Sequence, residues 1–118
     1  MLGHLDAMLR ASHVGAEIEA RSVPVAGKGI FALIAAGCIP AGSRDNLAYA
    51  NEFTDWDRAS DAEKVLLADA QTSGGLLLCV PQRRLESVLT LLKLLKAPCA
   101  AVIGRIVRSA KPKIRVSS

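Results

Sequence analysis

Aromatic residues are scarce in this chain of 118 residues. The aromatic side chains are Phe31, Tyr49, Phe53 and Trp56, although half of all residues are hydrophobic. The core must therefore be built mainly from Leu, Ile, Val and Ala. A chain of this length is sufficient for one domain, residues 1–118, that folds without disulfides or a structural metal.

Cysteine is also rare, and the sequence lacks a metal-binding pattern. Cys38, Cys79 and Cys99 are odd in number and show no Cys-x-x-Cys spacing, which argues against a disulfide framework and a zinc site. We expect all three to be small buried hydrophobic residues. His4 and His13 have no metal-ligating residue at a suitable spacing, so we expect no metal site in this chain.

Long hydrophobic runs are missing. The longest, such as "GGLLLCV" and "LTLLKLL", fall far short of the roughly 20 residues that span a bilayer, and the N-terminus has no signal-peptide pattern. We therefore expect a cytoplasmic protein with no membrane partner.

Positive charge is in excess, with a formal net charge of +4 that is concentrated toward the C-terminus. No aromatic residue lies within that basic stretch, so bases would have no stacking platform. A solvated surface explains the charge more simply than nucleic-acid binding does.

The first half of the chain predicts two helices and a strand. Leu2, Leu5 and Leu9 share one face of a helix over 2–12, which Gly15 can stop. Residues 16–20 alternate as in a half-buried strand near a sheet edge, and a short helix within 27–37 can end at a left-handed Gly37. The polar segment 39–58 predicts a surface connection with one helical turn around 47–50.

The second half predicts further helices and strands. Ser60 and Glu63 form a Ser-x-x-Glu capping box that begins a helix ending near Asp69. Residues 76–80 are apolar throughout, which favours an interior strand covered on both faces. An amphipathic helix over 82–96 and strands within 99–108 and 113–117 follow. The order predicts an α+β domain with a mixed sheet of about four strands, packed by helices.

The segment "QTSGG" leaves two interpretations open. The adjacent glycines Gly74 and Gly75 leave backbone amides unobstructed, and together with Thr72 and Ser73 they could bind phosphate in an anion-binding concavity. However, strong phosphate loops lie between a strand and a following helix, whereas these glycines precede the expected strand, so a structural turn explains them as well. No nucleophile, base and orienting partner form a catalytic pattern, and no catalytic residue is assigned.

Several segments together resemble the C-terminal domain of the selenophosphate synthetase (selenide, water dikinase) family. They are "LGHLDAM", "GAEIEARSVPV", "AAGCIPAGSRDNLAY", "ADAQTSGGLLLCVP", "AAVIGRIV" and "KIRV". The resemblance implies the aminoimidazole-ribonucleotide-synthetase superfamily and the α+β fold of its C-terminal domain. It also implies a full-length enzyme that uses ATP and magnesium to convert selenide and water into selenophosphate, AMP and phosphate.

Two departures from the family are mild. Ala70 stands where the family has Pro, and Ala41, Gly42 and Ser43 replace Gly-Gly-Thr. A third is serious, because the family's catalytic Cys or selenocysteine, its Lys and its metal-binding Asp residues have no counterpart here. The resemblance therefore implies a lid domain that is inactive by itself and whose partner is the missing N-terminal ATP-binding domain.

Other functions stay open at this point. The domain could be a standalone scaffold that forms a homodimer through the surface left uncovered by the missing half. It could also be the equivalent domain of another kinase of the superfamily, although those relatives lack the Gln-Thr-Ser-Gly-Gly-Leu-Leu string. A nucleic-acid-binding protein is the least favoured interpretation.

Overall fold

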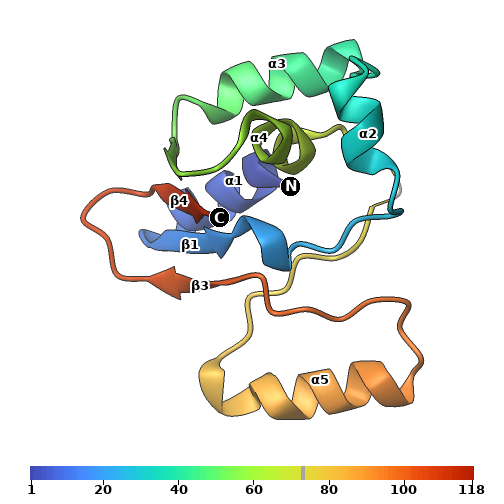
Figure 1. Ribbon diagram of the computed structural model, residues 1–118. Helices are drawn as coiled ribbons and strands as arrows, with labels where there is room; N and C mark the ends of the chain where they lie inside the picture. The colour runs from blue at the N-terminus through green and yellow to red at the C-terminus, as the bar shows by residue number, and fades with distance from the viewer. Residues whose placement is uncertain (73) are drawn as a thin grey trace.

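A four-stranded mixed sheet organises the molecule (Figure 1). The computed structural model describes residues 1–72 and 74–118. The strands follow the order β2-β4-β1-β3 across the sheet. Their bounds are β1 (Gly15–Glu19), β2 (Thr54–Asp57), β3 (Gly104–Val107) and β4 (Ile114–Ser117). This confirms the expected α+β domain with about four strands.

The pairing brings the first and the last strand of the chain, β1 and β4, side by side at the centre of the sheet. β1 is parallel to β4 and antiparallel to β3, and β2 is parallel to β4. The expectation that residues 16–20 lie near a sheet edge is wrong, because β1 has a neighbour on each side. The strand is half-buried because the sheet has one face on the core and one charged face turned away from it.

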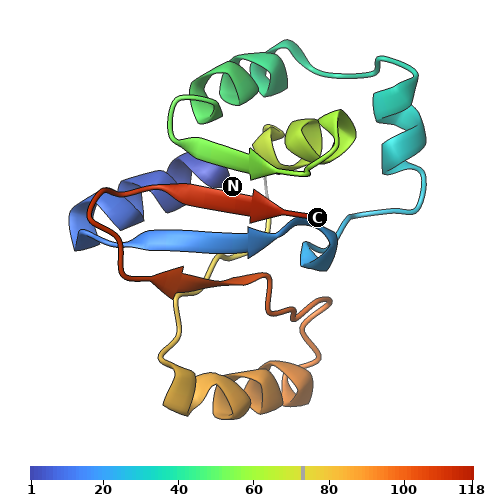
Figure 2. The same cartoon turned by 60° about the vertical axis from the view of Figure 1, so that its left-hand side comes forward.

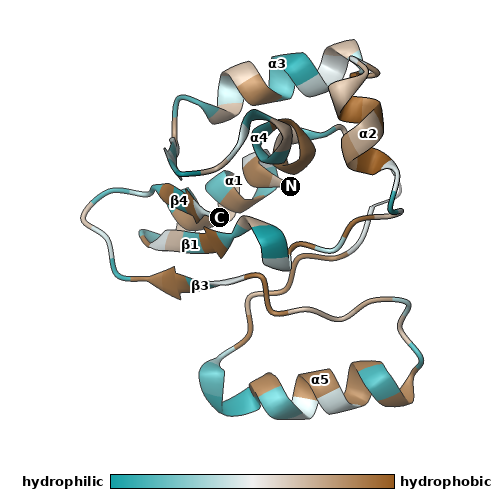
Figure 3. Ribbon diagram, viewed as in Figure 1, coloured by the Kyte–Doolittle hydropathy of each residue, from teal (hydrophilic) through white to brown (hydrophobic). Residues whose placement is uncertain are grey.

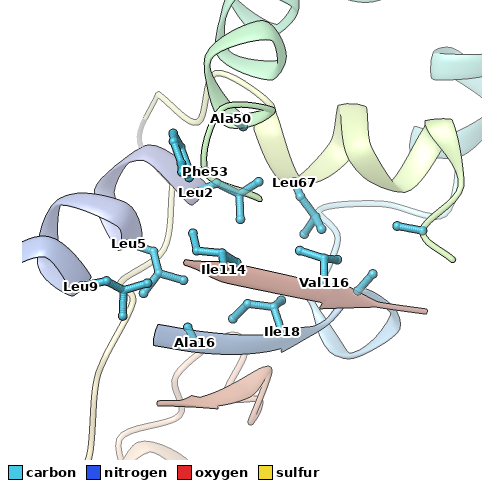
Figure 4. Close-up of a cluster of buried hydrophobic side chains, with 12 residues drawn as sticks. Leu2, Leu5, Leu9, Ala16, Ile18, Ala50, Phe53, Leu67, Ile114 and Val116 are labelled. Carbon is cyan, nitrogen blue, oxygen red and sulfur yellow. The ribbon is translucent and has the colours of Figure 1, made fainter. Parts of the chain in front are cut away.

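The hydrophobic core lies between one face of the sheet and two helices, α1 (Leu2–Ser12) and α4 (Asp61–Ala68). Figure 4 shows Leu2 of α1 and Leu67 of α4 above Ile114 and Val116 of β4, with Leu5 and Leu9 of α1 to their left. The predicted helix over 2–12 is confirmed, although His13 in a left-handed conformation, rather than Gly15, caps its end. Complete burial of these leucines makes this face the main source of stability.

The predicted capping box of α4 is also confirmed. The Ser60 hydroxyl accepts from the Glu63 amide, and the Glu63 carboxylate accepts from the Ser60 amide at 2.7 Å. The same carboxylate accepts a hydrogen bond from the Ser118 hydroxyl at 2.9 Å, next to the end of β4. These hydrogen bonds hold the start of α4 and the end of β4 together.

The segment 39–58 forms more regular structure than the predicted surface connection. It contains helix α3 (Ala41–Ala50) and strand β2, where we expected one helical turn and a loop. The helix has a weak sequence signal because Ser43 and Ala50 are its buried residues. In β2, pairing with β4 outweighs the poor strand propensity of Asp55 and Asp57.

Segment 76–80 is not the predicted interior strand. Leu76 is 90% exposed and Leu78 is 53% exposed, and the segment has no regular secondary structure. A short apolar run cannot be distinguished by periodicity from an extended connection, and β2 takes the fourth place in the sheet. Of the predicted strand within 99–108, residues Gly104–Val107 pair as β3.

The cysteines were also assigned wrongly. Cys38, Cys79 and Cys99 are all exposed rather than buried. Each lies in a connecting segment rather than in a helix or strand of the core, so its apolar character is not used in packing.

Helix α2 (Ile30–Ala35) confirms the short second helix, and Gly37 follows it with φ of 78° as expected.

The helix predicted over 82–96 forms as the 3₁₀ turn η2 (Gln82–Arg84) and α5 (Leu85–Leu94). Figures 1 and 2 both place α5 beyond β3, at the other end of the sheet from α3. No residue of α5 is fully buried.

The sheet face away from the core carries a row of alternating charges. Glu17 of β1 lies between Arg105 of β3, at 2.6 Å, and Arg115 of β4, at 3.8 Å. Asp55 of β2 lies 3.5 Å from Lys113. Such exposed pairs add little stability but favour the observed strand register.

Gly104 allows β3 to approach β1 closely. A Cβ atom at this position would lie 2.1 Å from the carbonyl oxygen of Glu17. Any side chain here would therefore force the two strands apart.

Among the described residues, no helix has the length and hydropathy needed to cross a membrane.

Candidate functional site

A cavity of about 610 Å³ lies where the glycine segment meets the N-terminal end of α1. Three parts of the chain line it: the start of α1, the C-terminal half of α3 and the segment after α4. Its polar and glycine lining residues are Gly3, His4, Asn46, Tyr49, Asp69, Gln71, Gly74 and Gly75. The cavity therefore joins the segment singled out by sequence to residues far from it in the chain.

A tight turn shapes the glycine segment. The Gly74 amide donates to the Gln71 carbonyl at 3.2 Å, and the Thr72 amide donates to the Ala70 carbonyl at 3.1 Å. A Cβ atom on Gly74 would lie 3.0 Å from the Cβ of Gln71, so any other residue would push Gln71 away and the turn favours glycine there. The structural interpretation of Gly74 is thus well supported, because its amide is already used within the turn.

Gly75 differs from Gly74 in both respects. A Cβ atom added to Gly75 would meet nothing within 4 Å, so packing does not require a glycine at this position. Among the described residues, no backbone carbonyl accepts a hydrogen bond from its amide. Among the described residues of this turn, the amides of Gly75 and Gln71 are therefore the backbone donors left for a ligand.

The first turn of α1 lines the same cavity. Its first backbone N–H groups have no acceptor within the helix, and Met1 provides no side-chain cap. The first turn also carries no acidic residue to neutralise the positive end of the helix dipole. The lining residues Gly3 and His4 thus contribute a positive backbone potential to the cavity.

Asp69 is the carboxylate that lines the cavity. Its Oδ1 atom accepts a hydrogen bond of 2.5 Å from the buried hydroxyl of Ser43. Burial lowers the pKa of the Met1 α-amino group from its ordinary value, and the nearby Asp69 charge partly opposes that change. The cavity is therefore of mixed charge, with backbone donors on one side and one carboxylate held by a neighbour.

The structure separates the four predicted phosphate-binding residues. Gly74 and Gly75 line the cavity, and Thr72 is not among its described lining residues. Ser73 lies outside the described residues. The sequence did not assign Ser43 or Asp69 to this site: Asp69 was one of several carboxylates considered for magnesium, and Ser43 stands where the resembling family has another hydroxyl residue, threonine.

Within the described part of the chain, no three His, Cys, Asp or Glu side chains converge in a way that could hold a metal ion. His4 lines the cavity, and His13 caps the opposite end of the same helix. Asp55 and Glu63 make the contacts with Lys113 and Ser60 described above. The described lining of the cavity thus offers backbone amides, the His4 ring and the Asp69 carboxylate among its polar groups.

The fold and the cavity together define an α+β domain in which a glycine turn and the N-terminus of α1 line the same cavity. Residues 1–117 match the family described as "AIR synthase related protein, C-terminal domain", and the chain belongs to this family.

Curated relatives narrow the comparison further. The chain is 40% identical over 105 residues to a selenide, water dikinase of Porphyromonas gingivalis strain W83, covering 88% of this chain and 30% of that protein. It is 35% identical over 117 residues to the Clostridioides difficile strain 630 protein of the same name, covering 98% and 33%. A Carboxydothermus hydrogenoformans protein of that name is 38% identical over 117 residues, again covering 98% and 33%. The chain thus spans about a third of the length of these relatives and corresponds to their C-terminal part.

Proposed function

We propose that this chain is the C-terminal lid domain, residues 1–118, of a selenophosphate synthetase. The family match over residues 1–117 and the relatives named selenide, water dikinase carry this proposal. The reaction would turn ATP, selenide and water into selenophosphate, AMP and phosphate. The lid would close over a site whose nucleotide and metal ligands belong to an ATP-binding partner domain.

The chain by itself should have no catalytic activity. Phosphoryl transfer depends mostly on positioning and on neutralising charge with metal ions and cations. The described residues include no cluster that could hold magnesium, and the sequence has no counterpart of the family's catalytic Cys and Lys. We expect the 118-residue chain to release no selenophosphate from ATP and selenide, as measured by ³¹P NMR; release above the protein-free control would refute this point.

The cavity beside the glycine turn would contact a phosphate group of the nucleotide or product. The Gly75 amide and the first amides of α1 are the donors that support this role, since phosphate is favoured at uncapped helix N-termini. Thr72 does not line the cavity, so it would contribute only if the turn rearranges when the lid closes, whereas the part of Ser73 stays a prediction. The contribution of the lid would then be to hold phosphate and exclude water rather than to break a bond.

Two variants of one residue test the phosphate site. Gly75→Pro removes the amide hydrogen, whereas Gly75→Ala keeps it and adds a methyl group in open space. We expect inorganic phosphate at millimolar concentration to shift the Gly75 amide resonance in the wild-type chain. Binding, measured by shifts of the Gly3 and His4 amides, should persist in the alanine variant and be lost in the proline variant. Absence of any wild-type shift would leave the segment a structural turn.

A self-associating module is the second candidate function. Large apolar side chains are exposed around α5, with Leu91 at 54%, Leu94 at 73% and Leu95 at 70%. Figure 3 shows hydrophobic colour along α5 and both connections that lead to it. Surfaces of this kind are usually covered by a partner. Sedimentation at micromolar concentration separates the two functions, because a monomer supports the lid domain and a stable dimer supports the module.

A further inference from the structure

Ser43 is an unusual residue in its helix. Most of α3 faces solvent, and Ser43 and Ala50 are the residues it buries. Ser43 is only 1% exposed, although it is a polar residue on a helix of low hydrophobicity. A polar group buried this completely is expected to have a hydrogen-bonding role.

The Ser43 hydroxyl makes two hydrogen bonds to consecutive residues at the exit of α4. It donates to Oδ1 of Asp69 at 2.5 Å and accepts from the amide of Ala70 at 3.2 Å. Asp69 is the C-cap residue of α4, and its backbone, with φ of −54° and ψ of 146°, has left the helical region. One side chain of α3 therefore fixes the direction in which the chain leaves α4.

The glycine turn begins immediately after this fixed point. Gln71, whose carbonyl accepts from Gly74, is the next residue after Ala70. Ala70 has no ring that would restrict its own backbone. The Ser43 contacts therefore restrain the start of the turn from a neighbouring helix, through hydrogen bonds to Asp69 and Ala70.

We propose that Ser43 is the positioning residue of the phosphate-binding turn, through its paired hydrogen bonds to Asp69 and Ala70. This inference rests on the proposed phosphate site, but it concerns how the site is held rather than whether it exists. Ser43 is not among the residues that line the cavity, so it would act through Asp69 and Ala70 rather than by touching the ligand.

Three variants test the inference by phosphate titration followed with amide shifts. Ser43→Ala removes both hydrogen bonds, and we expect phosphate affinity to fall about tenfold, the effect of losing roughly one net hydrogen bond. Ser43→Thr keeps the hydroxyl and should restore affinity to within about threefold of wild type. Ser87→Ala, an exposed serine-to-alanine change on α5, is the matched control and should have no effect.

A second measurement needs no variant. The Ala70 amide of the wild-type chain should exchange with deuterium more slowly than the Gly75 amide, because Ser43 accepts its hydrogen bond. Equal rates for the two amides would overturn the inference, as would wild-type phosphate affinity in a folded Ser43→Ala variant. Failure of the wild-type chain to bind phosphate would instead refute the proposed site, while the exchange rates would still report on Ser43.

Discussion

Helices α1 and α5 are both rich in leucine and both amphipathic, yet only α1 is part of the core. Leu2, Leu5 and Leu9 of α1 are each 1% exposed, while Leu94 and Leu95 beside the end of α5 remain mostly in solvent. The difference lies in what each helix meets: α1 packs on the sheet, and α5 makes its main contacts with the adjoining turn η2. An apolar stripe thus predicts a helix but does not identify the surface that covers it.

Substituting one leucine in each helix tests this comparison with the largest expected effect. Leu5→Ala should lower the free energy of unfolding by about 3 kcal/mol, because it opens a cavity in the core. Leu94→Ala should change it by less than about 0.5 kcal/mol, because the side chain is exposed. Urea denaturation of both variants measures the two values. Similar losses would mean that α5 packs against the core in solution.

A substitution at Gly104 tests the packing of β3, the strand that lies between β1 and helix α5 (Figure 1). Gly104→Ala places a methyl group against the Glu17 carbonyl and should destabilise the domain by about 2 kcal/mol. Gly27→Ala is the control, since a Cβ atom there meets nothing within 4 Å. Amide exchange should accelerate first in β3 and least in α1. An unchanged Gly104→Ala variant would contradict the close β1–β3 pairing.

The capping box gives a smaller effect that depends on pH. Hydrogen bonds from the backbone and hydroxyl of Ser60 lower the pKa of Glu63 below its ordinary value of 4.5. The ionised carboxylate therefore stabilises the fold above pH 4.5, and this stabilisation disappears as the pH falls through the lowered pKa. Glu63→Gln should cost about 1 kcal/mol at pH 7 and progressively less as the pH falls below the lowered pKa, as measured by urea denaturation across the acid range. An equal cost at all pH values would contradict the role of the charge.

Local signals in the sequence predicted the fold well where one residue decides the structure. The Ser60–Glu63 box and the left-handed Gly37 were both correct, because each depends on contacts within a few residues. The strand expected at 76–80 and the missed strand β2 were wrong for the opposite reason. Strand pairing joins distant segments, and the polar residues of 54–57 pair with β4 while the apolar run does not.

The same difference between local and long-range contacts decided which residues of the candidate site could be predicted. Glycine pairs are visible in sequence, so Gly74 and Gly75 could be selected before their place beside the cavity was known. Ser43 and Asp69 lie 26 positions apart and meet only because α3 packs against α4. No local pattern connects them, and the threonine of the resembling family was the one available clue.

A chimeric enzyme tests the central claim most directly. Residues 1–117 would replace the matching C-terminal segment of the Clostridioides difficile selenide, water dikinase, with the parent enzyme as the positive control. The lid-domain account predicts ATP-dependent selenophosphate formation by the chimera, detected by ³¹P NMR, and none by the isolated chain. A folded chimera that is inert beside an active parent, or turnover by the isolated chain, would contradict it.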